Sequence, residues 1–331
     1  MDPLSDLLSL LRPAATLSSG FTAGGDWCID FGDQRGQIKC YVILSGACWM
    51  AVEGEPEPVH LEQGDAFVLA RGRPFRLASD LSLPGTPAAV LFPGAGPGGQ
   101  VRLGDRPTFS LAGARFAVDG HPAQLLLGLL PAVLRLVGQA ERAALQWAVE
   151  RMRQEMRDAL PGARLLVQDL AHMMLVQALR AHLATTHRQE TGWLAALSDH
   201  RLRQALQSLH AQPARRWTLQ ELGAQAGMSR TLFATRFRAV MGETPMQYLT
   251  RWRMVLACDR LAHSSESVTD MALSLGYESI SAFSTAFRRV VGQSPQQYRR
   301  AAAAPAVTSR AGVVTPQRQA PHAGVHLAAG R

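Results

Sequence analysis

The sequence predicts an α+β protein: an N-terminal β-barrel with two following helices, then an all-α C-terminal domain with two helix-turn-helix motifs. Three observations lead to this fold class: short strand-like runs over residues 38–83, helical periodicity after about residue 139, and a repeat within residues 218–298. A chain of 331 residues has room for roughly two domains, each able to bury a core.

The strand-like runs are IKCYVILSG, ACWMAVEG, PVHLEQGD and AFVLARGRPF, which are separated by turns rich in Gly, Pro and Glu. Short runs of Val, Ile, Leu, Trp and Phe at such spacing favour an antiparallel barrel or sandwich. A Gly/Pro-rich segment at 92–100 interrupts the pattern, and VRLG and FSLAGARFAVDG are expected to add one or two strands. We therefore expect residues 1–131 to form the β-domain.

A helical pair is expected at 132–186. Apolar residues fall on one face of a predicted helix over about 139–160, and a second helix is expected over about 164–184. The pair would pack on its own barrel or on the second subunit of a homodimer. Residues 187–198 are expected to be a linker and 303–331 a disordered tail. The residues on the shared face are Leu145, Val149, Met152, Met156 and Leu160.

Residues 199–302 are expected to form the helical domain, because one pattern occurs there twice. TLFATRFRAVMGETPMQY at 231–248 recurs as SAFSTAFRRVVGQSPQQY at 281–298. Ser229 and Ser279 stand at N-cap positions, and Gly242 and Gly292 stand where each helix ends. A Thr-Pro or Ser-Pro pair then starts the next helix. The segment PMQYLTRWRMVLACDRLAH between the copies predicts a connecting helix about 28 Å long.

The outward faces of the two repeated helices are the candidate site. At 100° per residue the Phe and Val positions face inward, which leaves small polar residues and Arg outside. Such a face suits a major groove, in which side chains hydrogen-bond base edges. The alternative is an ordinary solvated face, but two matched faces favour nucleic acid. The outward residues are Thr231, Ala234, Thr235 and Arg238 in the first copy and Ser281, Ser284, Thr285 and Arg288 in the second; Arg230, Arg236 and Arg289 flank them as candidate phosphate contacts.

The charge distribution supports a polyanionic partner. The formal net charge is +8, and residues 199–300 carry 14 Arg against 7 acidic residues, whereas residues 1–198 carry 17 Lys and Arg against 19 acidic residues. A basic domain beside a nearly neutral one is typical of a protein that binds a polyanion, and with the two outward helix faces the expected partner is double-stranded DNA.

The composition argues against a secreted protein, a membrane protein and a protein built on a metal site or disulfides. The N-terminus lacks a basic lead-in, and the apolar stretch at 125–137 is too short for a membrane span and contains Pro131 and Arg135. A cytoplasmic protein without a membrane partner is therefore expected. The four cysteines show no C-x-x-C spacing, so neither a zinc site nor a disulfide framework is predicted. No metal and no cofactor are expected.

The segment GYESISAFSTAFRRVVGQSPQQYRR at 276–300 closely resembles the AraC/XylS family of transcription regulators, and the likeness extends over 199–300. The resemblance implies two recognition helices in successive major grooves. It places base-facing positions at Thr231, Ala234 and Thr235 and at Ser281, Ser284 and Thr285. Family members often carry Arg where Thr235 and Thr285 stand, so contacts to thymine methyls become more plausible here. RNA polymerase is a further partner if the protein is an activator, which one sequence does not distinguish from a repressor.

Residues 2–131 resemble the cupin-type effector domain of one branch of this family, through DPLSDLLSLLRP, GGDWCIDF, YVILSGACWM, LEQGD and ARGRPFRLAS. The resemblance implies a sensor for a small molecule or a dimer surface. Enzymatic cupins hold a metal with an H-x-H pair, but the comparable strand here reads Lys39-Cys40-Tyr41, and Arg76 stands where a further His is common. A non-enzymatic regulator is therefore expected. The alternative is a metal-dependent cupin oxygenase fused to a DNA-binding domain.

A redox switch is a further hypothesis for the sensor domain. Cys28, Cys40 and Cys48 all lie in it. The competing interpretation treats them as small buried apolar residues and is favoured.

Overall fold

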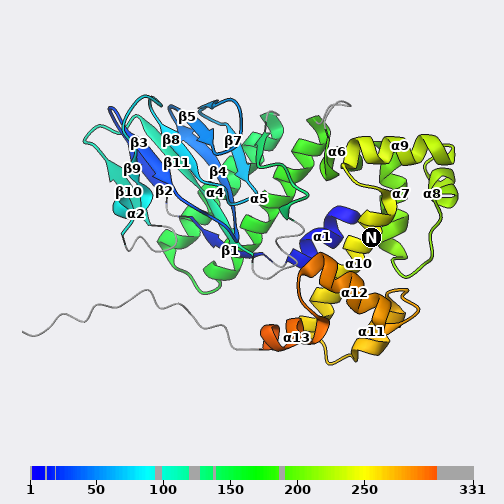
Figure 1. Ribbon diagram of the computed structural model, residues 1–331. Coiled ribbons are helices and arrows are strands. Elements are labelled where there is room, and N and C mark those ends of the chain that lie inside the picture. Colours follow the sequence, from blue (N-terminus) through cyan, green and yellow to red (C-terminus); the bar gives the residue numbers. More distant parts are fainter. Residues whose placement is uncertain are drawn as a thin grey trace, which may run out of the picture.

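The computed structural model describes residues 2–11, 13–18, 20–93, 99–118, 127–136, 139–185 and 191–303. A body of strands and a body of helices lie side by side, and the N-terminal helix α1 (Pro3–Leu11) lies against the helical body (Figure 1). Residues 187–190 of the expected linker lie outside the described residues, and 193–198 form a buried helix instead of a linker because their apolar side chains pack into the main core. The expected tail also lies outside the described residues, apart from Ala303.

The N-terminal strands form two sheets, and within the described ranges no ladder joins them into a closed barrel. Pairing is antiparallel except for β10 with β2 and β3 with β9. The predicted runs and returning strands are present as β4 to β8, β10 and β11. The larger sheet has the order β10 (Gln100–Leu103), β2 (Gly20–Ala23), β11 (Phe109–Ala117), β4 (Gln37–Ser45), β7 (Ala66–Leu69) and β12 (Val133–Leu136), with β1 (Ala14–Leu17) on β11; the smaller has β6 (Val59–Glu62), β5 (Ala47–Val52), β8 (Phe75–Ala78), β3 (Cys28–Phe31) and β9 (Thr86–Pro87).

The larger sheet is buried on both faces. Side chains alternate along a strand, so Tyr41 and Ile43 of β4 pack between the sheets, whereas Cys40 and Val42 pack toward the helices. This two-sided burial explains the continuous apolar run of β4. A short helix, α2 (Ala88–Leu91), packs near β3 and β9.

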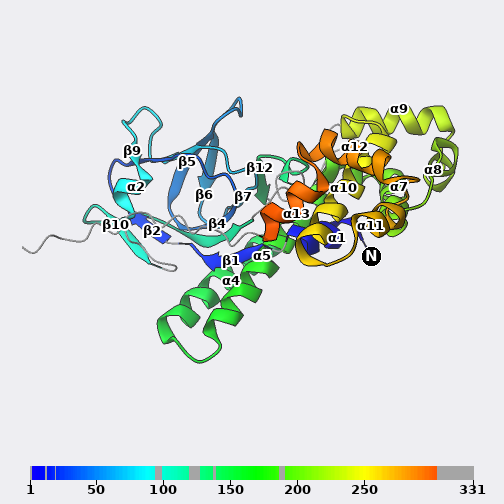
Figure 2. The ribbon, with the colours of Figure 1, turned by 60° about the horizontal axis from the view of Figure 1, so that its bottom comes forward.

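The helical pair consists of α4 (Gln139–Asp158) and α5 (Ala163–Thr185), which form a hairpin beneath the larger sheet (Figure 2). Leu145, Val149 and Met152 are fully buried as predicted. Leu160 is 59% exposed, because it lies in the turn beyond the end of α4 and not on its inner face. Residues 133–136, which fall in the range expected to be helical, form β12 because they pair with β7.

The C-terminal part is entirely helical in the described residues, and α8–α9 and α11–α12 are its two helix-turn-helix motifs. The predicted boundaries are confirmed, since Ser229 and Ser279 cap α9 and α12, and Gly242 and Gly292 end them at φ 76° and 84°. The elements are α6 (Trp193–Ser198), α7 (His200–Ala211), α8 (Leu219–Gln225), α9 (Arg230–Met241), α10 (Pro245–His263), α11 (Val268–Ser274), α12 (Ile280–Val291) and α13 (Pro295–Ala303).

The two motifs differ in what they are packed against. Phe233 and Phe237 of the first motif belong to one apolar core that continues through α7 to α1, α5 and the larger sheet. Phe283 and Phe287 of the second motif belong to a separate core with the second half of α10. The first motif is therefore joined to the N-terminal domain by packing. No helix in the described residues is long and apolar enough to cross a bilayer.

Candidate DNA-binding interface

The second recognition helix, α12, presents the predicted face to solvent. Phe283, Ala286, Phe287 and Val291 are buried, which fixes the opposite side of α12 as the outer face. The predicted residues of that face are exposed, except for Ser284, which is half-buried. They line a surface hollow of about 380 Å³: Ser281, Ser284, Thr285, Arg288 and Arg289.

The first recognition helix, α9, repeats this arrangement with one difference. Phe233 and Phe237 are buried, and Ala234 is half-buried. The exposed predicted residues are Arg230, Thr231, Thr235, Arg236 and Arg238. Arg236, however, donates from Nε to Asp199 Oδ2 at 2.8 Å. Asp199 also caps α7, so this ion pair ties α9 to α7. The charge of Arg236 is thus largely neutralised.

Each recognition helix carries positive charge without an acidic partner among the described residues. Arg230, Arg238, Arg288 and Arg289 have no acidic partner within the described part of the chain. Some other arginines of the helical domain are paired with acidic residues, for example Arg216 with Glu278 and Arg251 with Glu243. The faces predicted to meet DNA therefore carry guanidinium groups that are available for phosphates or base edges.

The connecting helix α10 holds the two motifs apart. Its 19 residues span about 28 Å, close to the separation of about 34 Å between successive major grooves on one side of DNA. Leu249 and Trp252 pack into the core of the first motif, and Met254 and Leu261 lie in that of the second. Trp252 and Trp217 are both buried, so they serve the core and do not form base-stacking surfaces.

The loop before α8 also joins the two motifs. Arg253 of α10 donates to the carbonyls of Pro213 and Arg215 at 2.7 and 3.1 Å, and its guanidinium lies over the Tyr277 ring. Gly276 packs so closely on this loop that an added Cβ would lie 2.1 Å from the Ala214 carbonyl oxygen. The relative orientation of the motifs is thus held by backbone contacts as well as by α10.

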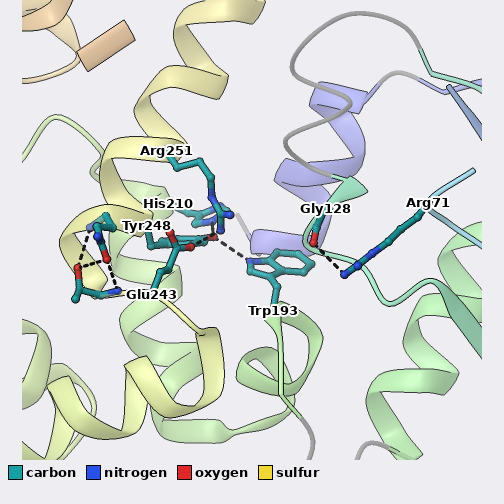
Figure 3. Close-up of polar contacts among 9 residues, drawn as sticks. Arg71, Gly128, Trp193, His210, Glu243, Tyr248 and Arg251 are labelled. Carbon is teal, nitrogen blue, oxygen red and sulfur yellow. Dashed lines mark hydrogen bonds and ion pairs between the residues drawn. The ribbon is translucent and has the colours of Figure 1, made fainter. Parts of the chain in front are cut away.

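Trp193, His210 and Tyr248 form a buried polar network (Figure 3). Through His210 this network also reaches Asp6 of the N-terminal helix. His210 of α7 contacts Asp6 Oδ2 through Nδ1 at 3.1 Å and the Tyr248 hydroxyl through Nε2 at 2.6 Å. Trp193 Nε1 donates to the same hydroxyl at 2.9 Å. Because a carboxylate only accepts, Nδ1–H is the donor to Asp6, and the neutral ring then accepts the Tyr248 proton at Nε2.

Burial keeps this imidazole neutral. Desolvation lowers the pKa of His210, and the hydrogen bond to Asp6 acts in the opposite direction. The ring also stacks on Trp252, with centroids 3.9 Å apart. Sequence reasoning missed the network because it brings together residues of α1, α6, α7 and α10. The one signal in the sequence is Tyr248, which ends the first copy of the repeat as Tyr298 ends the second.

The four cysteines are all buried. Desolvation raises the pKa of the Cys40 and Cys48 thiols to about 12, and it also raises the pKa of Cys28. Such thiols are protonated at neutral pH and react slowly with oxidants. This favours their interpretation as apolar core residues. Arg76 forms an ion pair with Asp30 at 2.7 Å, and the described residues contain no cluster of three His, Cys, Asp or Glu suited to a metal.

The two-sheet domain and the paired, arginine-bearing recognition helices define a DNA-binding protein of the double helix-turn-helix class. Residues 2–184 match a family model described as cupin, and residues 222–301 match one described as a helix-turn-helix domain. The chain belongs to the AraC/XylS family of transcription regulators.

Two relatives are similar to this chain along most of its length. A putative AraC-like transcription regulator of Streptomyces antibioticus is 38% identical over 85% of this chain and 93% of its own length. The HTH-type transcriptional regulator MtrA of Neisseria gonorrhoeae is 28% identical over 84% of this chain and 91% of its own length. The solved DNA-binding domain of AdpA in complex with a target DNA is 34% identical and covers 29% of this chain and 87% of that chain, with a TM-score of 0.28.

Proposed function

We propose that this regulator reads its operator with α9 and α12 in successive major grooves. The observation that carries the proposal is the pair of matched outer faces with four unpaired arginines. Thr231, Thr235, Ser281 and Thr285 would contact base edges or thymine methyls, and Arg230 and Arg289 would hold phosphates. Arg236 would contribute less, because Asp199 already binds it.

The test begins with selection of bound duplexes from a random pool, followed by gel-shift titration of the selected sequence. We expect a retarded complex that survives excess nonspecific DNA at moderate salt. The variant Arg238→Ala/Arg288→Ala should weaken that complex, whereas Arg164→Ala, an exposed charge on α5 far along the chain from α9 and α12, should not. Binding without sequence selectivity would contradict the proposal.

The N-terminal domain is proposed to control DNA binding through the first motif. Support comes from the apolar core that the two share and from the network that joins Asp6, His210 and Tyr248. A small-molecule effector in the sensor domain would act by shifting the packing of α1 and α5 on the helical domain. We also propose a cytoplasmic location and, if the protein is an activator, contact with RNA polymerase, since the relatives are transcription regulators.

A homodimer through the α4–α5 hairpin is proposed as the working assembly. Trp147 of α4 is 59% exposed and Leu165 of α5 is 63% exposed, and large exposed apolar side chains often mark an interface. Analytical ultracentrifugation should show a dimer that Trp147→Glu/Leu165→Glu converts to a monomer. A wild-type monomer at tens of micromolar protein would contradict this assembly.

We further propose that the protein is not an enzyme. Lys39 occupies the strand position where a cupin oxygenase carries a metal-binding His, and Arg76 is held by Asp30. Neither of these cationic side chains is a usual ligand for a metal ion. Elemental analysis of the purified protein tests this point, because stoichiometric iron or nickel would favour the oxygenase alternative.

A further inference from the structure

The sensor domain contains one unusual charged residue. Lys39 is the only lysine of the 331-residue sequence, and it lies on β4 with 7% of its surface exposed. Its Nζ lies 4.9 Å from the centroid of the Phe31 ring and 5.1 Å from that of Phe75. A buried ammonium ion is costly unless a partner compensates its charge.

No acidic side chain compensates it in the described residues. Arg115 of β11 lies directly opposite Lys39 in the strand register. Like charges at facing positions destabilise an antiparallel pair. Desolvation and, to a smaller extent, Arg115 lower the pKa of Lys39 to about 8. Arg115 is exposed and donates from Nε to the Thr16 hydroxyl at 3.2 Å, so the cost to the folded state comes mainly from the buried ammonium of Lys39.

Both cations line a cavity between the sheets. Its volume is about 310 Å³, and no acidic residue lines it. One part of the wall is apolar and includes Phe21, Phe92 and Leu111. The polar part adds the hydroxyls of Ser18 and Tyr41, whose oxygens lie 3.0 Å apart. The cavity therefore pairs a cationic end with an aromatic and aliphatic wall.

We propose that this cavity binds a small molecule with one carboxylate on an apolar body, with the carboxylate between Lys39 and Arg115. An ammonium and a guanidinium together supply charge-assisted hydrogen bonds to a planar anion. The apolar wall accepts the remainder of the molecule, and the volume limits it to a small ligand. The inference names the class of effector for the sensor domain and in that respect rests on the proposed function.

The single lysine makes the site directly observable. Biosynthetic labelling with ¹³C-lysine gives one set of side-chain signals, all from Lys39, in the full-length protein. We expect 3-phenylpropanoate to shift these signals and to raise the pKa of Lys39, because a bound anion favours the ammonium form. The neutral amide of the same acid should leave them unchanged, and so should inorganic phosphate, which lacks an apolar body.

Variants separate this site from general charge effects. In calorimetry, Lys39→Met should weaken binding of 3-phenylpropanoate by about tenfold or more, as for loss of a hydrogen bond to a charged group. Arg115→Met should act in the same direction, and Arg164→Met, a surface charge on α5, should have no effect. The inference would be overturned if the acid and its amide bound equally well, or if phosphate bound in preference to both. It would also be overturned if hexanoate, benzoate and 3-phenylpropanoate all gave no response at millimolar concentration.

Measuring operator binding by the same variants keeps the two proposals apart. Lys39→Met without ligand should bind the selected DNA as the wild type does. Retained DNA binding with no carboxylate binding would reject the cavity inference alone. Carboxylate binding in a protein that shows no selective DNA binding would reject the proposed DNA reading alone.

Discussion

The Tyr248 hydroxyl lies 2.6 Å from Nε2 of His210 and so joins α10, which spaces the two helix-turn-helix motifs, to α7 and through Asp6 to the N-terminal helix. Tyr298, at the same position of the second copy, forms a side-chain hydrogen bond with the Cys258 thiol, and the described residues offer it no counterpart of His210 or Trp193. Two equivalent positions of the repeat therefore have different roles. The first connects domains, and the second completes a local core.

Replacing Tyr248 with Phe should lower the free energy of unfolding by about 1 to 3 kcal/mol, because Trp193 Nε1–H and His210 Nε2 would lose a buried partner. Tyr298→Phe is the matched control and should cost less, since a thiol is a weak hydrogen-bonding group. Chemical denaturation of both variants measures the difference. Equal costs would show that the network adds nothing beyond packing.

Mild acid should destabilise the interdomain network. The pKa of His210 is lower in the folded state than in the unfolded state. Its contribution to the free energy of unfolding is therefore fully present above the unfolded pKa of about 6.5 and declines as the pH falls below that value. A protonated ring would donate from Nε2, which leaves the Tyr248 proton without its acceptor. The thermal unfolding temperature should therefore fall more steeply between pH 7.5 and 5 for the wild type than for His210→Gln. Parallel pH profiles would rule out this role.

Two turn glycines should respond differently to the same substitution. Gly227 in the first motif has φ 61°, and no atom lies within 4 Å of an added Cβ. Gly227→Ala should therefore lower the free energy of unfolding only by the strain of a left-handed residue, about 1 to 2 kcal/mol. Gly276 in the second has φ 82° and would place its Cβ against Ala214. Gly276→Ala should cost more and disturb the link between the motifs. A comparison of unfolding midpoints tests this order.

Arginines on the recognition helices should separate into two groups in DNA titrations. Arg238→Ala and Arg288→Ala should each weaken operator binding by about 1 to 3 kcal/mol if the side chain contacts a base, or reduce the salt slope by about one if it contacts a phosphate. Arg236→Ala should mainly destabilise the fold, because it breaks the ion pair with Asp199. Loss of affinity with unchanged stability for Arg236→Ala would reverse this assignment.

Local chemistry explains why much of the helical domain could be predicted. A Ser cap, a Gly at the left-handed end and a Pro at the next helix start act within a few residues of each other. They produced correct boundaries for α9, α10 and α12. The same locality explains the errors: Leu160 had the right helical period but falls after the end of α4, and residues 133–136 form a strand because β7 offers a partner.

The sequence by itself determined the repeated motifs, their buried Phe residues and the outward faces with their arginines, because periodicity and capping depend on near neighbours. Only the tertiary structure decided that Arg236 is neutralised by Asp199, that Lys39 faces Arg115 across a ladder, and that Asp6 reaches His210 over 204 positions of sequence. Contacts of this kind follow from strand register and from the packing of whole elements. Their positions are set by many weak interactions acting together, which no short stretch of sequence contains.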